Sequence, residues 1–63
     1  METFLDVLQL LKKYGVFIYI GDRLAEFNLM EQEINELYQN KLISNEEYMR
    51  ALLIIKKERR KYS

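Results

Sequence analysis

The chain has 63 residues with ten basic and ten acidic side chains, so its net charge is zero, and it contains no histidine, cysteine, proline or tryptophan. A chain of this length forms one small domain with a thin core, because a domain of about 60 residues buries only about 60% of the surface that its unfolded chain exposes. The missing cysteine and histidine exclude disulfides and zinc sites of the usual ligands, which leaves well-formed helices and self-association as supports.

The first helix is predicted over about residues 4–14. Thr3 is a suitable N-cap, and Asp6 occupies the position from which a capping-box side chain reaches back to the cap. Five apolar side chains recur at helical spacing on one face: Phe4, Val7, Leu8, Leu11 and Tyr14. Gly15 follows the helix at the position where glycine is favoured.

The segment Val16–Ile20 is β-prone by composition, but no second run in the chain resembles it. A sheet within the chain therefore lacks a partner strand. We predict instead an extended connector that packs alternate side chains on the helices. A strand paired across a dimer is the less favoured alternative.

Two further helices are predicted, over about residues 22–40 and 45–61. Asp22 is the expected N-cap of the first, and Ser44 with Glu47 forms a capping box at the start of the second. Because the connection between them is short, they should be antiparallel neighbours. The sequence thus predicts an all-α protein: a single domain over residues 1–63, folded as a compact three-helix bundle with a short extended connector between helices 1 and 2.

Residues suited to catalysis are scarce. Without histidine and cysteine the chain lacks the commonest general base and the best nucleophile. Paired glutamates such as Glu46 and Glu47 lie on predicted solvated helix faces, and neither a glycine-rich phosphate motif nor a calcium loop is present. We therefore expect a protein that is not an enzyme and that uses no cofactor, no metal and no small-molecule substrate.

The first residues are acidic and lack the basic region of a signal peptide. The longest apolar runs, Val16–Ile20 and Ala51–Ile55, are five residues each, whereas a membrane-spanning helix needs about 20. These features predict a cytoplasmic protein with no membrane partner.

Charge is spread unevenly along the chain. The first 55 residues carry five bases and nine acids, a net −4, whereas the last eight carry five bases and one acid, a net +4. Proteins that bind single-stranded nucleic acid combine cations for the backbone with aromatic faces for the bases. Two stretches contain both, and their candidate nucleic-acid-binding residues are Lys12, Lys13, Tyr14, Tyr19 and Arg23, and Lys56, Lys57, Arg59, Arg60, Lys61 and Tyr62.

Each stretch also has a structural interpretation. Core packing is the favoured interpretation of the rings of Tyr14, Phe17 and Tyr19. A solvated helix end whose bases suit the helix dipole is the favoured interpretation of the tail. Recognition of duplex DNA is disfavoured, because the third helix begins with Glu46 and Glu47, which would face phosphates.

The run Ala51–Ile55 is apolar around more of the helix than two neighbours can cover. Met49, Leu53 and Ile54 lie off the core-facing stripe and form a candidate protein interface, unless the connector covers them. This surplus predicts a homo-oligomer. A protein–protein adaptor or oligomerisation module is therefore the alternative to the leading hypothesis, the binding of single-stranded RNA or DNA.

Nearly the whole chain is similar to one protein family. The resemblance rests on Leu10–Leu24, with its Tyr-Gly-Val-Phe-Ile-Tyr-Ile-Gly-Asp-Arg core, and on Leu29-Met30-Glu31, Glu36-Leu37-Tyr38 and Ala51-Leu52-Leu53-Ile54. These segments resemble the YqgQ-like family of small bacterial proteins. The resemblance implies a compact three-helix fold in the cytosol and single-stranded nucleic-acid binding, and it brings no catalytic motif. The family's Gly-Asp-Arg positions match Gly21, Asp22 and Arg23, where a helix cap with an ion pair serves as well as a functional role.

Overall fold

Two antiparallel helices and a third that crosses them make up the described part of the chain. The computed structural model describes residues 1–19 and 21–62. Its helices are α1 (Phe4–Lys13), α2 (Arg23–Gln39) and α3 (Asn45–Arg59), and α3 continues into a single 3₁₀ turn, η1 (Arg60–Tyr62). The predicted all-α three-helix bundle with an extended connector is confirmed. The third α-helix ends two residues before the predicted position, because the backbone tightens into the 3₁₀ turn at Arg60.

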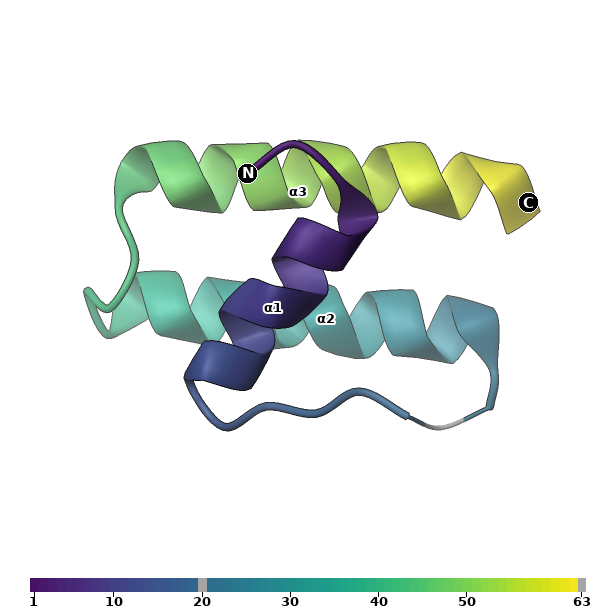
Figure 1. Cartoon of the computed structure of the whole chain (residues 1–63), viewed down its shortest axis with the longest axis horizontal. Helices are drawn as coiled ribbons and strands as arrows, with labels where there is room; N and C mark the ends of the chain where they lie inside the picture. The colour runs from purple at the N-terminus through teal and green to yellow at the C-terminus, as the bar shows by residue number, and fades with distance from the viewer. Residues whose placement is uncertain (20, 63) are drawn as a thin grey trace.

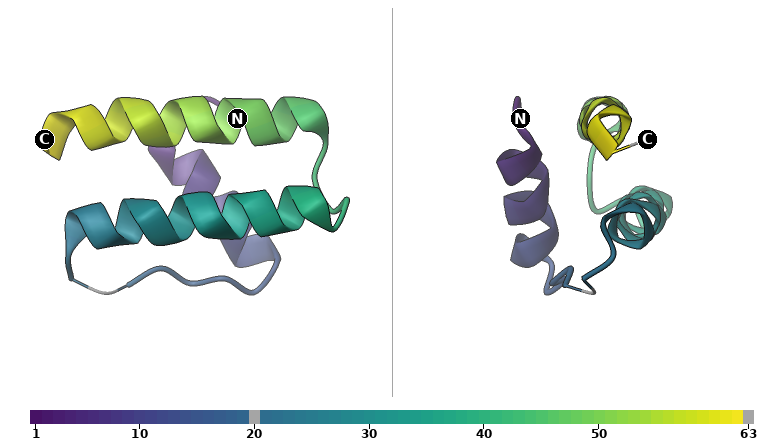
Figure 2. Two further views of the ribbon diagram at one scale, coloured as in Figure 1. Left: turned by 180° about the vertical axis from the view of Figure 1, so that it is seen from behind. Right: turned by 90° about the vertical axis from the view of Figure 1, so that its right-hand side faces the viewer.

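The helices form two layers. In Figure 1, α2 and α3 lie side by side, and α1 crosses both of them at a steep angle. Figure 2 shows α1 alone on one side and the α2–α3 pair on the other. In Figure 1 the described part of the connector between α1 and α2 runs along the lower edge of the molecule, and none of the described elements lies below it.

Capping boxes fix the starts of α1 and α3. The Asp6 carboxylate accepts hydrogen bonds from the backbone N–H groups of Glu2 and Thr3, at 2.9 and 3.0 Å, and the Thr3 hydroxyl accepts the Asp6 N–H at 3.2 Å. The same exchange joins Ser44 and Glu47 at 3.1 and 2.9 Å. Both predicted capping boxes are confirmed. The backbone donors of Glu2 and Thr3 hold the pKa of Asp6 below its usual value of 3.8.

The end of α1 turns the chain into the connector. Gly15 has a φ of 81°, a left-handed conformation that glycine adopts without steric cost. The Val16 N–H then donates to the Leu11 carbonyl oxygen at 2.9 Å, closing the helix end in a Schellman motif. The chain therefore leaves α1 sharply and runs back alongside the bundle.

Helix α2 ends in the same motif, but with a lysine where α1 has glycine. Lys41 has a φ of 60°, and the Leu42 N–H donates to the Leu37 carbonyl oxygen at 2.9 Å. The left-handed conformation is unfavourable for a residue with a Cβ atom. The tight α2–α3 turn therefore stores strain at Lys41.

Replacing Lys41 with glycine is expected to raise the free energy of unfolding by about 0.5–1 kcal/mol, since relief of the left-handed strain exceeds the entropy that glycine loses. Urea unfolding followed by circular dichroism measures the change. Lys41→Ala is the matched control, because alanine removes the charge and keeps the strain. Equal stabilisation by both variants would trace the effect to charge and contradict the prediction.

The core lies where the two layers meet. Among the described residues the buried apolar side chains are Val7, Leu11, Phe27, Met30, Ile34, Leu37, Ile43, Ala51 and Ile55. Phe27 joins the layers, because its ring meets that of Phe4 from α1 edge to face, with centroids 5.7 Å apart. The short helix α1 is thus held in place by a few apolar side chains that pack against α2 and α3.

A pair of stacked tyrosines links α2 to α3 near their turn. The rings of Tyr38 and Tyr48 are nearly parallel, 9° apart, with centroids separated by 4.1 Å. Each hydroxyl donates to an asparagine of the other helix: Tyr38 to Asn45 at 3.1 Å, and Tyr48 to Asn35 at 3.4 Å. This arrangement fixes the register of the helical hairpin.

Candidate functional site

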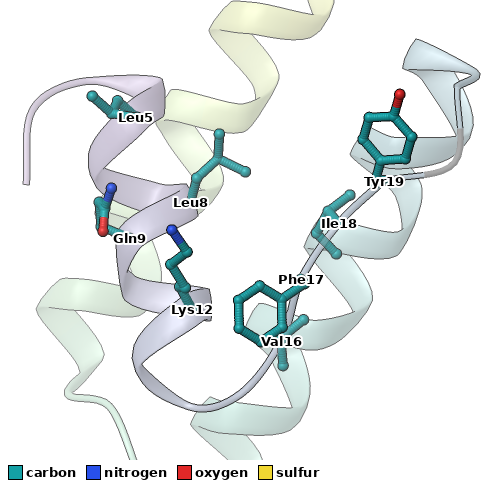
Figure 3. A pocket seen from close by; sticks show the side chains of 8 residues that line it. All are labelled: Leu5, Leu8, Gln9, Lys12, Val16, Phe17, Ile18 and Tyr19. Carbon is teal, nitrogen blue, oxygen red and sulfur yellow. The ribbon is translucent and has the colours of Figure 1, made fainter.

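An apolar pocket of about 310 Å³ opens between α1 and the connector (Figure 3). Its lining residues are Leu5, Leu8, Gln9 and Lys12 from α1, and Val16, Phe17, Ile18 and Tyr19 from the connector. The four helix residues recur at intervals of three, one and three, which places them on one face of α1. The pocket therefore lies between one face of α1, which borders the core at Leu8, and the side chains of the connector.

Side chains along the connector alternate between the core and the solvent. Val16 and Ile18 are partly buried against the core, whereas Phe17 and Tyr19 are 70% and 93% exposed. The predicted alternation is confirmed, but core packing, the favoured interpretation of these rings, is wrong for Phe17 and Tyr19. Successive side chains of an extended segment point to opposite sides, and the helices cover only one side here.

One cation from the last turn of α1, Lys12, lines the pocket together with these rings. Lys12 and the ring of Phe17 stand on opposite walls of the pocket in Figure 3. In the described chain, neither Lys12 nor Lys13 takes part in an ion pair. The Lys12 ammonium is therefore available to an anionic ligand next to exposed aromatic surface, whereas the Lys13 ammonium lies near the ring of Tyr14.

Tyr14 has a structural role, as the core interpretation predicts. Its hydroxyl donates to the Leu42 carbonyl oxygen at 2.9 Å, and its ring is half-buried against the core. The Lys13 ammonium lies 5.8 Å from the centroid of the same ring. Tyr14 thus ties the end of α1 to the α2–α3 turn and presents less free ring surface than Tyr19.

A second aromatic–cation pair forms at the N-terminal end of α2. The Arg23 guanidinium lies 5.4 Å from the centroid of the Tyr62 ring, which is itself 5.8 Å from that of Phe27, and Tyr62 is 49% exposed. The cap and ion pair expected at Gly-Asp-Arg are also present, since Asp22 caps α2 and Arg23 lies 3.6 Å from Glu26. The fold brings Arg23 and Tyr62 together from stretches that are far apart in the sequence.

Arg59, a candidate from the basic tail, is engaged within the fold. Its guanidinium donates to the Glu31 carboxylate at 2.6 Å and to the Asn28 side-chain oxygen at 2.9 Å. The ion pair is mostly shielded, with 31% of the Arg59 side chain and 24% of that of Glu31 exposed. Arg59 therefore binds α3 to α2 rather than facing the solvent.

The other tail cations lie at the surface. Lys61 pairs with Glu58 at 3.2 Å, one turn back along the chain. Lys56, Lys57 and Arg60 are exposed. The pocket lining contains none of these tail residues, and Lys12 is the cation that the described part of the pocket contains. The structure therefore separates the basic tail from the aromatic connector.

The candidate protein interface on α3 is partly exposed to solvent. Met49 and Leu53 are 53% and 65% exposed, and their spacing of four residues makes them neighbours on the helix surface. Ile54 is partly buried against the core. An apolar strip of two side chains thus remains uncovered within the described chain, on an element other than those that line the pocket.

Sequence reasoning missed most of the pocket. Leu5, Leu8 and Gln9 are not among the predicted site residues, and core packing is the favoured interpretation of Phe17. The available signal is Leu5, which lies off the core-facing stripe of α1 and is exposed. The pocket itself depends on where the connector runs, which helical periodicity does not specify.

Among the residues that the structure describes, no group of three or more acidic, histidine or cysteine side chains is placed to hold a metal ion. None of the described helices is both long and apolar enough to traverse a lipid bilayer. The paired glutamates lie at the start of α3, where Glu47 belongs to the capping box.

Comparison with known proteins agrees with the resemblance seen in the sequence. The family model described as YqgQ-like matches residues 1–61. A curated relative from Bacillus subtilis (strain 168), described as "Uncharacterized protein YqgQ", is 47% identical over 58 residues, which cover 92% of this chain and 82% of that protein. The chain therefore belongs to the YqgQ-like family.

Proposed function

We propose that the protein binds single-stranded nucleic acid along its connector, with Phe17 and Tyr19 stacking on bases and Lys12 and Lys13 contacting phosphates. The observation that carries the proposal is the exposure of the two rings in a pocket that also holds Lys12, which forms no ion pair within the described chain. Exposed rings are a cost to a protein that does not use them, because water must surround their apolar surface. Base stacking would cover this surface.

The spacing of the rings favours a single strand. Residues two apart on an extended segment are separated by about 6.6 Å along the chain. Stacked bases in a duplex rise only about 3.4 Å per nucleotide, so neighbouring rings at this spacing match bases that are unstacked and drawn apart. The segment is also flanked by Gly15 and Gly21, with φ values of 81° and 80°, which bound the extended backbone.

Electrostatic attraction is modest in this proposal. The chain as a whole carries no net charge, so long-range steering is weak. Two lysine–phosphate contacts predict a salt dependence with a slope of about −1.4 in log affinity against log salt, at roughly −0.7 per contact for single strands. Lys56, Lys57 and Arg60 would steepen this slope only where a longer strand reaches the end of α3. Arg23 with Tyr62 would be a second stacking point for such a strand.

The proposal is tested by fluorescence anisotropy of labelled oligo(dT) and oligo(U), titrated at about 50 and 200 mM salt. The Phe17→Ala/Tyr19→Ala double variant is expected to bind at least about tenfold more weakly than wild type, because two stacking surfaces are lost. The matched control is Met49→Ala/Leu53→Ala, which removes exposed apolar surface from α3 and should leave binding unchanged.

Two results would reject the proposal. One is unchanged affinity in the Phe17/Tyr19 double variant. The other is the absence of binding by wild type at the lower salt concentration and high protein concentration. A Lys56→Gln/Lys57→Gln/Arg60→Gln variant separates the tail from the connector, since a weakening confined to long oligonucleotides assigns the tail a secondary role.

A protein–protein adaptor is the second candidate function. The observation that favours it is the exposed pair of Met49 and Leu53 on α3. A partner with an apolar groove would receive these side chains as an i, i+4 anchor, as amphipathic helices commonly do. In that case the Met49/Leu53 double variant would lose partner binding, while the Phe17/Tyr19 double variant would retain it.

A further inference from the structure

The connector presents an extended backbone that no other described part of the chain pairs with. The Val16 N–H is bonded to the end of α1, but within the described residues the N–H groups of Phe17, Ile18 and Tyr19, and the carbonyl groups of Val16 to Tyr19, make no backbone hydrogen bond. The segment lies at the edge of the molecule (Figure 1). An unpaired extended edge of this kind is a template for another strand.

The connector lacks the residue types that usually prevent such pairing at the edge of a sheet. Natural edge strands are usually blunted by lysine, proline or a bulge. The stretch between Gly15 and Gly21 contains no charge and no proline, and it is composed of β-branched and aromatic residues. Its composition therefore favours a strand, although the chain supplies no second strand to pair with it.

The sequence of this segment is nearly palindromic in residue type. Phe17 and Tyr19 flank Ile18 symmetrically, and Gly15 and Gly21 lie three residues to either side of it. Both glycines have nearly the same φ, 81° and 80°, a left-handed conformation that suits a change of chain direction at each of them. If a second copy of the segment paired antiparallel to the first, with the two Ile18 residues opposite each other, each position would face a residue of the same or a similar type.

We infer that two copies of this chain associate through their connectors, as an antiparallel two-stranded ribbon with Ile18 on the two-fold axis. In this register Phe17 lies opposite Tyr19 of the partner subunit, and Gly15 lies opposite Gly21 of the partner subunit. Each aromatic pair is a direct cross-strand pair, which is a favourable arrangement in antiparallel sheets. The two-fold symmetry satisfies both edges with the same contacts, as a closed dimer requires.

Charges at the ends of the segment fit the same arrangement. The end that follows α1 carries Lys12 and Lys13, a net +2, and the other end carries Asp22 beside the ion pair of Arg23 and Glu26, a net −1. Antiparallel pairing brings the basic end of one copy toward the acidic end of the other, whereas parallel pairing would bring like charges together. The ribbon is short, so the association is weak and appears at high protein concentration.

The interface does not rest on the proposed binding of nucleic acid. Pairing uses the backbone edge, and it leaves the rings of both copies on the outward face of the ribbon. The dimer is therefore measured without nucleic acid, and a negative result here would leave the proposed function standing.

The register is tested by disulfide cross-linking, which is clean because the chain has no cysteine. Phe17→Cys and Tyr19→Cys are prepared separately, then mixed and oxidised. Directly opposite positions lie about 4.5–5.5 Å apart between Cα atoms, within the range of a disulfide. Diagonal positions at about 7–8 Å are too distant. We expect the mixed cross-link to exceed either homodimer several-fold, with Leu53→Cys as the control for random collision.

The wild-type chain provides an independent measurement. Amide NMR shifts followed on dilution from about 1 mM to about 20 µM should change at residues 15–19, and sedimentation should show a dimer at the higher concentration. A wild-type chain that stays monomeric throughout overturns the inference. So does a mixed cross-link no stronger than the homodimers or the Leu53→Cys control.

Discussion

Replacing Phe27 with alanine is expected to lower the free energy of unfolding by about 3–5 kcal/mol. The Phe27 ring is fully buried, with rings from Phe4 and Tyr62 at centroid distances of 5.7 and 5.8 Å and the Arg59 guanidinium at 6.0 Å. Its removal leaves a cavity that touches every helix. A chain of 63 residues has a total stability of about 3–9 kcal/mol, so the substitution removes at least about a third of it.

Urea unfolding followed by circular dichroism, with a melting curve where the variant is too unstable, measures this loss. Phe17→Ala is the matched control, because it deletes the same side chain at a position that is largely exposed. Its free energy of unfolding should stay within about 0.5 kcal/mol of wild type. Similar losses in both variants would contradict the placement of Phe27 at the centre of the core.

Arg59→Ala is expected to cost about 2–3 kcal/mol, the larger part of it from leaving Glu31 without its partner in a shielded position. Arg59 joins α3 to α2 through Glu31 at 2.6 Å and Asn28 at 2.9 Å. Lysine at this position should recover part of the loss, since it keeps the charge but cannot reach both oxygens with a planar fork.

A double-mutant cycle separates the pair from its surroundings. Arg59→Met and Glu31→Gln are made singly and together, and the coupling energy should be about 1–2 kcal/mol. Arg60→Ala provides the control, because its side chain is exposed next to Arg59 in the chain. A coupling energy near zero would show that the short contact contributes nothing in solution, and the tail would again be available as a whole to an anionic ligand.

The helices were predictable because their signals are local. A capping box lies within four consecutive residues, as Thr3 to Asp6 and Ser44 to Glu47 show, and helical spacing needs only one turn of sequence. The extended connector also followed from its composition and from the lack of a second strand. These features depend on residues that are close together in the chain, so they can be predicted from the sequence.

Features that depend on tertiary contacts were not predictable. Alternation along the connector places Phe17 and Tyr19 on the side opposite to Val16 and Ile18. It does not predict which of the two sides packs against the helices. Arg59 was grouped with the other tail cations because its partner Glu31 is 28 residues away. The left-handed conformation of Lys41 was not predictable either, because glycine rather than lysine is the residue that usually indicates it.

The cluster around Phe27 has a consequence for synthesis on the ribosome. Its three rings come from the beginning, the middle and the end of the chain, at Phe4, Phe27 and Tyr62. Ribosomes add about 5–20 residues per second, and they release the N-terminal helix first. The cluster cannot close until Tyr62 has left the exit tunnel. Until then the nascent chain carries an unshielded apolar face on α1, so the core around Phe27 closes only after all three helices have been synthesised.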